Sequence, residues 1–173
     1  MGLAPYGEPR FADLIKEHLL DLKDDGSFRL NMDYFAFCHK MVMITKRFER
    51  LFDAPARTPE TPISQHTMDV AASVQKVTEE ILLRMARHVF EQTGKKNLVL
   101  AGGVALNCVG NGRILREGPF EQIWIQPAAG DAGGALGAAL FVWYQLLDHK
   151  RVTGPGDLQK GSLLGPSFGN DVI

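Results

Sequence analysis

The chain has 173 residues, of which 45% are hydrophobic and 23% are charged. This length and composition suit one globular domain and exclude intrinsic disorder for most of the chain. The 19 basic and 20 acidic residues leave a formal net charge of −1. Such a balance gives no electrostatic footprint for nucleic acid or for an anionic membrane surface, so neither is expected as a partner.

The sequence carries no sign of a membrane span or of secretion. No apolar segment is long enough for a spanning helix, and the N-terminus lacks the basic and apolar regions of a secretory signal. We therefore expect a cytoplasmic protein. Its two cysteines, Cys38 and Cys108, are too few for a disulfide scaffold and too far apart for a CxxC motif. Both are expected to be reduced and buried as small hydrophobic residues.

Both ends of the sequence have the character of internal segments of a longer chain. Residues 1–8 place two glycines and a proline around Tyr6, which is typical of an interior-type loop. The tail at residues 152–173 stops on apolar residues just after a turn. We therefore expect a longer parent protein, and apolar surface left exposed by its missing parts would favour self-association.

The N-terminal third is predicted to hold a helix, a turn and a strand. After Pro9, which suits a first helical turn, apolar residues recur at helical spacing over residues 11–22 and predict one helix. The sequence Asp-Asp-Gly at residues 24–26 predicts a turn. Apolar and polar residues then alternate over residues 28–34, which predicts a half-buried strand.

The middle of the chain is predicted to be helical on both sides of a proline-rich loop. A short helix is expected over residues 44–52, and residues 53–65 must be irregular because each proline fixes φ and removes a backbone donor. A long helix is expected from about residue 67 to residue 92, with Gly94 as its C-terminal cap. Four charged residues lie off its apolar stripe and are expected to solvate its outer face: Glu79, Glu80, Arg84 and Arg87.

The last third predicts the order strand, helix, strand, helix within residues 97–148. The apolar runs at residues 98–101 and 123–125 are typical of strands buried on both faces. Helices are expected from about residue 107 to 115 and from about residue 133 to 147, each after a glycine turn. Because such a unit joins parallel strands, the sequence predicts an α/β fold with an at least partly parallel sheet.

The two glycine turns form the candidate ligand site. Gly102 and Gly103 follow the first strand, while Gly130, Gly133 and Gly134 precede the last helix. Ligands gather at the carboxyl ends of parallel strands, where the free N–H groups of a helix start favour phosphate. Glycine reaches positive φ cheaply and has no Cβ to keep a ligand away. Two such turns, one strand apart, predict a grip on one nucleotide.

Neither turn is specific by itself. The spacing matches neither the GxGxxG dinucleotide fingerprint nor the Walker P-loop. The alternative that the glycines only permit close packing of helix against sheet, as Gly137 would, stays open at this point. Asp131 also has two interpretations, because an Asp before a helix serves as an N-cap or as a carboxylate ligand of a divalent metal.

The remaining candidates for catalysis or metal binding are weak. The five histidines show neither HxxxH nor HExxH spacing, so each is expected to be structural. A complete metal site is therefore not expected from this chain alone. A nucleophilic serine is also unsupported, because the sequence contains no G-x-S-x-G elbow.

Several segments, taken together and in order, closely resemble the NodU-type carbamoyltransferase family. The likeness covers almost the whole chain. It is carried by LVLAGGVALNC at residues 98–108, QPAAGDAGGALGAA at 126–139, MGLAPYG at 1–7, RF at 47–48 and HTMDVAASVQ at 66–75.

The resemblance implies the C-terminal portion of a Kae1-like domain, within the actin-like ATPase superfamily and its ribonuclease H-like mixed sheet. Members of the family move a carbamoyl group from carbamoyl phosphate, through a carbamoyl-adenylate made with ATP, to a hydroxyl of a small molecule or oligosaccharide. Asp131 would be one ligand of a divalent metal, expected to be Fe²⁺. Carried over by position, the residues that would contact the nucleotide are Gly102, Gly103, Asn107, Gly130, Gly133 and Gly134.

Full-length members of that family carry parts that this sequence lacks. They have an N-terminal half with metal-binding histidines and a first phosphate loop, and a YrdC-like domain that makes the adenylate. The isolated chain is therefore expected to bind nucleotide weakly and to turn nothing over. Two alternatives stay open, namely a phosphotransferase of the same superfamily, such as a sugar kinase, and a non-catalytic assembly module.

Overall fold

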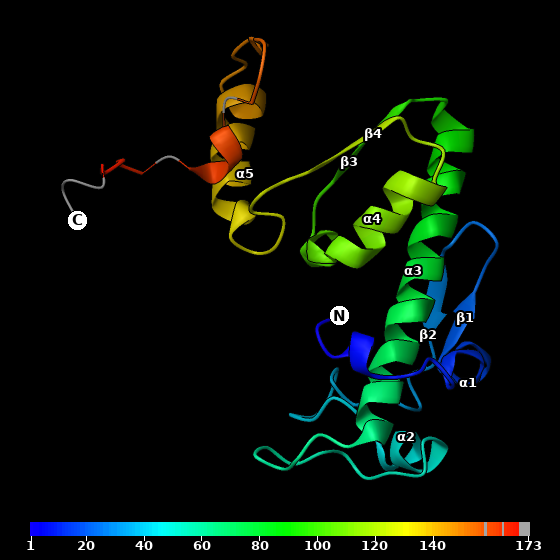
Figure 1. Ribbon diagram of the computed structural model, residues 1–173. Coiled ribbons are helices and arrows are strands. Elements are labelled where there is room, and N and C mark those ends of the chain that lie inside the picture. Colours follow the sequence, from blue (N-terminus) through cyan, green and yellow to red (C-terminus); the bar gives the residue numbers. More distant parts are fainter. Residues whose placement is uncertain (158, 164, 170–173) are drawn as a thin grey trace. The chain divides into compact units, whose positions relative to one another are not determined.

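The computed structural model describes residues 1–157, 159–163 and 165–169 (Figure 1). The chain divides into two compact units. The first unit comprises Met1–Lys96 and Asn107–Glu121, and the second comprises Asn97–Leu106 and Gln122–Ile173. Part of the tail predicted at residues 152–173 lies outside the described residues. The boundaries expected for a single domain stay a prediction.

The first unit is built around the long helix α3, Gln65–Thr93. The helix begins after Ser64, whose hydroxyl accepts a hydrogen bond from the Thr67 N–H, as an N-cap does. It ends at Gly94, which has φ +60° in the left-handed region. The predicted helix and its glycine cap are confirmed, because the apolar spacing and the cap agree on the same segment.

Helix α1, Ala12–His18, is shorter than predicted, and the expected helical end at residues 20–22 is wrong. These residues form strand β1, Leu20–Leu22, which pairs antiparallel with β2, Phe28–Leu30. Cross-strand pairing with the apolar residues of β2 outweighs the helical spacing. The predicted turn at residues 24–26 is confirmed, with Gly26 at φ +85°. The expected strand over 28–34 ends at Leu30, because the Asn31 side chain accepts from the Asp33 N–H in a turn.

Other elements cover α3 and close the core of the first unit. The loop at the N-terminus holds one short 3₁₀ turn, Ala4–Tyr6. Helix α2, Lys46–Leu51, and the irregular loop after it are as predicted. Six buried apolar residues from four segments form the central cluster: Ala12, Ile15, Leu19, Tyr34, Phe52 and Val77.

Helix α4, Cys108–Glu117, packs on α3. Its residue Ile114 is buried, at 1% exposure. Charged side chains of α3 also meet other elements instead of only solvating its outer face. Glu79 pairs with Arg113 of α4 at 3.1 Å, and Glu80 pairs with Lys16 of α1 at 3.3 Å. The expectation of a purely solvated charged face is therefore wrong for these two carboxylates.

The second unit holds the predicted parallel strand pair. Strand β3, Asn97–Leu100, pairs in parallel with β4, Gln122–Ile125. The chain then forms helix α5, Gly133–Phe141, which continues into a π-helical turn at Val142–Leu146. Two 3₁₀ turns complete the unit, at Gly103–Leu106 and Lys160–Ser162. The predicted chain order of strands and helices is confirmed.

The burial predicted for these strands is wrong. Val99 is 71% exposed and its parallel neighbour Trp124 is 44% exposed. Within the described ranges the sheet has only these two strands, so the face that carries both side chains is not covered. The described residues also form two separate two-stranded sheets in place of one mixed sheet.

Two further findings concern the cysteines and the membrane. Cys38 and Cys108 are free, as predicted, but both are exposed, so their expected burial is wrong. Cys38 lies in a turn, and Cys108 lies at the first position of α4. Among the described helices, none combines the length and the apolar character that crossing a bilayer requires.

Candidate functional site

The two glycine turns lie side by side in the second unit. The Gly102 N–H donates to the carbonyl oxygen of Ala129 at 2.7 Å, which ties the turn after β3 to the turn after β4. A Cβ on Gly130 would lie 3.6 Å from the Leu106 side chain, an ordinary contact. Parallel pairing of β3 with β4 is what brings the turns together, because it places both strand ends at one edge.

At two of the five positions the backbone itself requires glycine. Gly102 has φ +98°, a conformation that residues with a side chain rarely adopt. A Cβ on Gly133 would collide with the carbonyl oxygen of Ala128. At Gly133 the close approach is therefore made by the protein's own chain and not by a ligand.

Three glycines of the second unit have no packing reason within the described residues. A Cβ on Gly103 or on Gly134 would have no heavy atom within 4 Å, and the same holds for Gly137 of α5. Close packing of helix against sheet therefore does not explain these three residues. The space beside Gly103 and Gly134 is open to solvent and to a ligand.

The backbone donors at the start of α5 are less free than predicted. The Gly133 N–H donates to the Gly130 carbonyl oxygen at 3.1 Å, and the Gly134 N–H donates to the Asp131 carbonyl oxygen at 3.0 Å. These turn bonds use two of the N–H groups that an unpaired helix start would offer to phosphate. The expectation of free donors at both glycines is therefore wrong, although the residues themselves stay accessible.

Asp131 is exposed and is not a helix cap. The N-cap of α5 is Ala132, and no side chain caps this helix. The capping interpretation of Asp131 is therefore wrong. Within the described residues its carboxylate takes part in no hydrogen bond or ion pair. Nowhere in the described ranges do three His, Cys, Asp or Glu side chains come together as a set that could hold a metal ion.

Asn107 belongs to the first unit, where its side-chain amide has a structural role. It is the N-cap of α4, and its side-chain oxygen accepts from the Gly110 N–H at 3.1 Å. Its amide also pairs reciprocally with that of Gln75 on α3, at 3.1 and 3.0 Å. These bonds join α4 to α3 in a partly buried position. A nucleotide contact through Asn107 would have to use the one amide hydrogen that they leave.

An ion network extends from this amide pair along α4. The Gln75 amide also donates to Glu79 at 2.7 Å, and Glu79 accepts from Arg113. Hydrogen bonds to the carboxylates of Glu117 and Glu79 raise the pKa of Arg113 above its ordinary value. The same bonds from Arg113 hold the pKa of Glu117 below its usual range. Arg113 and Glu117 therefore stay charged at neutral pH, and the bond from Arg113 to Glu79 fastens α4 to α3.

A buried polar cluster anchors the N-terminal loop, and the sequence analysis missed it. The side chain of Asp69 is 5% exposed and accepts from the Glu8 N–H at 2.9 Å, beside an ion pair with Arg10 at 2.8 Å. The Ser73 hydroxyl accepts from the Phe11 N–H at 3.0 Å. The Glu8 hydrogen bond is the main cause that lowers the pKa of Asp69. Asp69, Ser73 and Val77 share one helical face, and this spacing was the available signal.

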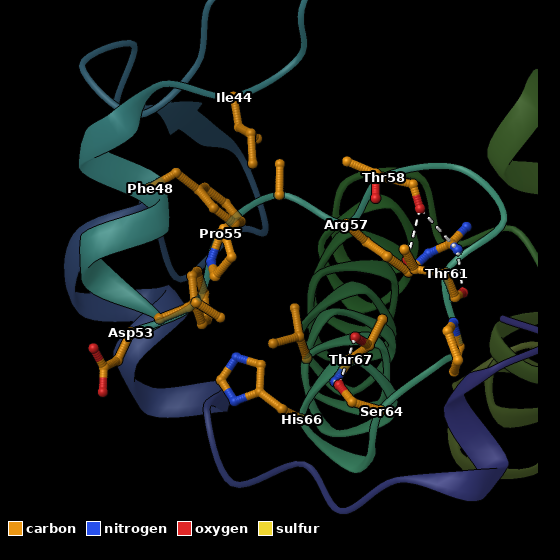
Figure 2. A pocket seen from close by; sticks show the side chains of 15 residues that line it. Ile44, Phe48, Asp53, Pro55, Arg57, Thr58, Thr61, Ser64, His66 and Thr67 are labelled. Atoms are coloured by element: carbon orange, nitrogen blue, oxygen red, sulfur yellow. Dashed lines mark hydrogen bonds between the residues drawn. The ribbon is translucent and has the colours of Figure 1, made fainter.

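Two hollows lie outside the glycine turns. One, of about 720 Å³, lies in the first unit between α2, the proline-rich loop and the start of α3 (Figure 2). The other, of about 1420 Å³, lies in the second unit against the open face of β3 and β4. Its lining includes Val99, Trp124 and Gly137, but none of the predicted site glycines.

Comparison with known proteins places these features in a family. The model of the carbamoyltransferase N-terminus matches residues 1–140, which include both glycine turns and the anchored N-terminal loop. The uncharacterized protein sll1178 of Synechocystis sp. is 60% identical over 173 residues, which are 100% of this chain and 28% of that protein.

Two nodulation proteins are also similar along nearly the whole chain. The nodulation protein NolNO of Sinorhizobium fredii is 38% identical over 99% of this chain and 23% of its own length. NolO of Bradyrhizobium diazoefficiens is 38% identical over 99% of this chain and 28% of its own length. The chain thus spans about a quarter of the length of these relatives. By the family match over residues 1–140, the chain belongs to the carbamoyltransferase family.

Proposed function

We propose that the chain is part of an ATP-dependent O-carbamoyltransferase. In this reaction a carbamoyl group derived from carbamoyl phosphate is carried as carbamoyl-adenylate to the hydroxyl group of an acceptor, a small molecule or an oligosaccharide. The acceptor oxygen forms a new bond to the carbamoyl carbon, and the bond from that carbon to the adenylate oxygen breaks with AMP as the leaving group.

The observation that carries the proposal is the pair of adjacent glycine turns. Gly102 is bonded to the neighbouring turn, while Gly103 and Gly134 have open space where a side chain would stand. Packing does not account for Gly103 and Gly134, and close approach of a ligand to backbone does. On this ground the proposed nucleotide contacts are Gly103 and Gly134, and Gly102, Gly130 and Gly133 are proposed from the family resemblance alone. Asn107 of the first unit is likewise proposed from the resemblance alone, through its remaining amide hydrogen.

In this proposal the turns act by binding and orientation. The start of α5 places the positive end of its backbone dipoles toward the nucleotide, which stabilises negative charge on phosphate. The N–H groups of Gly133 and Gly134 are held by the turn, so their main contribution is a rigid and narrow surface without Cβ atoms. A nucleotide held in this way presents its carbamoyl group in a fixed position for the acceptor.

A divalent metal, expected to be Fe²⁺, fits Asp131 only in part. The carboxylate is exposed and has no described partner, as a free metal ligand requires. One carboxylate does not make a site, and the described residues supply no cluster to complete it. Asp131 is therefore proposed as one ligand, with the others from the rest of the parent protein. When bound, the metal would supply Lewis-acid stabilisation of phosphate charge.

Two alternatives remain as competing proposals. A phosphotransferase, such as a sugar kinase, would use the same glycine turns for ATP. An assembly module would use none of them, and self-association through exposed apolar residues such as Trp124 and Leu146 would be its activity. Because the chain spans 28% of its Synechocystis relative, we expect the isolated chain to bind nucleotide weakly and to show no turnover.

The first experiment measures thermal unfolding of the chain with ATP, with Mn²⁺ or Fe²⁺, and with both. A ligand that binds only the folded state raises the unfolding midpoint by mass action. We expect a rise with ATP and a further metal-dependent rise that is lost in Asp131→Asn. Asp148→Asn is the matched control, because Asp148 is another exposed carboxylate of the second unit. No shift in any condition contradicts a nucleotide site in this chain.

The second experiment identifies the reaction in a longer protein. The segment of the Synechocystis relative that matches this chain is replaced by this chain, since the two are 60% identical over their full overlap. Pyrophosphate release from ATP that requires carbamoyl phosphate supports carbamoyl transfer. Transfer of phosphate from ATP to a sugar, without carbamoyl phosphate, identifies a sugar kinase instead.

A further inference from the structure

The hollow in the first unit has the size and the composition of a small-molecule site. Its volume is about 720 Å³, which falls in the range of roughly 300–1,000 Å³ that is common for ligand pockets. Figure 2 shows Phe48 and Pro55 on one side of this hollow and the start of α3 on the other. Its apolar lining is formed by Ile44, Phe48, Phe52, Pro55 and Val70.

His66 gives this pocket a polar group without a partner. Its Nε2 atom is shielded from solvent and has no hydrogen-bond partner within the described residues. The imidazole ring is held by Phe11, with the two ring centroids 5.2 Å apart. Buried nitrogen atoms in folded proteins almost always have a partner, in the protein, in water or in a ligand. The unpaired Nε2 beside a ligand-sized pocket therefore points to a hydrogen-bonding group that enters it.

Arg57 gives the pocket a positive charge. Its guanidinium donates to the carbonyl oxygens of Thr58 at 3.3 Å and of Thr61 at 2.8 Å, so the loop holds it in place. No carboxylate in the described ranges forms an ion pair with it. Asp53 also lines the pocket, but Figure 2 shows its carboxylate pointing away from the other labelled side chains. In the same view Arg57 and His66 lie on opposite sides of the pocket.

We propose that this pocket binds a small organic anion that has an apolar ring, a carboxylate at one end and a hydroxyl group at the other. The ring contacts Phe48 and Pro55, the carboxylate meets Arg57, and the hydroxyl pairs with His66 Nε2. Arg57 suits a carboxylate because its planar guanidinium donates in a fork. The proposal does not rest on carbamoyl transfer, since all of these residues belong to the first unit.

The test compares three probes on the full chain labelled with ¹⁵N in its histidines. The probe 4-hydroxyphenylacetate has the ring, the carboxylate and the hydroxyl, whereas phenylacetate lacks the hydroxyl and 4-methylphenol lacks the carboxylate. We expect 4-hydroxyphenylacetate to shift the ring nitrogen signals of His66 saturably and to spare those of His39. Each of the other two probes is expected to bind about tenfold more weakly, because each lacks one hydrogen bond to a charged or buried group.

Matched variants locate the site without relying on the probes alone. His66→Phe keeps a ring against Phe11 and removes the nitrogen, and Arg57→Gln removes the charge. Each is expected to weaken 4-hydroxyphenylacetate binding about tenfold. His39→Phe and Arg29→Gln change the same residue types at exposed positions outside the pocket and are expected to leave binding unchanged.

Three results would overturn the proposal. The first is a His66 signal that no probe moves at millimolar concentration, which would assign its partner to a buried water molecule. The second is equal binding of the three probes, which would mean an apolar hollow without polar recognition. The third is a His66→Phe variant that unfolds like the wild type and binds 4-hydroxyphenylacetate as tightly.

Discussion

Gly7 in the first unit and three glycines in the second unit have opposite surroundings. In the first unit a Cβ on Gly7 would collide with the Met68 carbonyl, so the N-terminal loop lies directly on the backbone of α3. In the second unit the positions beside Gly103, Gly134 and Gly137 are open. Close packing therefore explains Gly7 and does not explain Gly103, Gly134 or Gly137.

Polar side chains follow the same division. In the first unit Asp69, Ser73 and Gln75 are buried and bonded to segments far away in sequence. In the second unit no residue of α5 is buried, and Asp131 has no described partner. Segments that share the family resemblance thus differ in structure: Asp69, Ser73 and Gln75 are bonded within the fold, whereas Asp131 has no described partner.

The largest expected effect comes from Gly7→Ala. The added methyl group must displace the loop from α3, because the atom that it meets is backbone and not a flexible side chain. We expect a loss of about 3 kcal/mol in the free energy of unfolding, the upper range for overpacking. Gly2→Ala is the control, since Gly2 has no atom within 4 Å. Equal urea unfolding midpoints of the two variants would remove the proposed contrast between packed and open glycines.

Ser73→Ala is expected to have the next largest effect. The hydroxyl donates to the Asp69 carbonyl at 2.6 Å and accepts from the Phe11 N–H, so the variant leaves a backbone donor without its partner. We expect a loss of about 2 kcal/mol in unfolding free energy. In Thr78→Ala a similar hydroxyl bond to Val74 is lost, but no second segment is released, and the change should stay within about 0.5 kcal/mol. Urea titration of both variants checks the difference.

Acidification should weaken the first unit through Asp69. The pKa of Asp69 is lowered in the folded state, chiefly by the Glu8 N–H, so its contribution is complete above the ordinary value of 3.8. The contribution is lost as pH falls through the lower folded pKa, because the protonated carboxyl accepts these bonds poorly. Asp69→Asn should therefore be less stable than the wild type near neutral pH, and the difference should shrink below about pH 4.

Unfolding measured from neutral to acidic pH checks this dependence. Asp148→Asn, an exposed carboxylate in the second unit, should follow the wild type at every pH. If the difference in unfolding free energy between Asp69→Asn and the wild type did not change with pH, the cause would be a poor fit of the amide and not the loss of the negative charge.

Sequence predicts the elements of this chain where two signals agree. The long helix α3 has both apolar spacing and a glycine cap, and the parallel pair β3 and β4 has both apolar runs and glycine turns. The end of α1 has spacing alone, and there the pairing of Leu20 with Leu30 decides in favour of a strand. Local periodicity does not contain that long-range pairing, so the sequence could not settle it.

The position of the candidate site could be predicted from the sequence, but which of its backbone N–H groups would be free could not. The strand order placed the two turns together, and the bond from Gly102 to Ala129 bears this out. The turn bonds that occupy the Gly133 and Gly134 N–H groups depend on backbone angles that residue types do not specify. The buried anchor at Asp69 was hidden because an acidic residue at helical spacing resembles the solvated face of any helix.

The smallest expected effect on stability, and the most informative about binding, comes from Gly134→Ala. The methyl group enters open space at the start of a helix, where alanine is the better helix former, so unfolding free energy should change by less than about 1 kcal/mol. Gly137→Ala, one turn further along α5, enters open space as well and is the matched control. If the turns hold a nucleotide, ATP should raise the unfolding midpoint of Gly137→Ala and not that of Gly134→Ala. Equal responses to ATP would mean that the space beside Gly134 is not used by the nucleotide, and the second unit would then lose its distinguishing role.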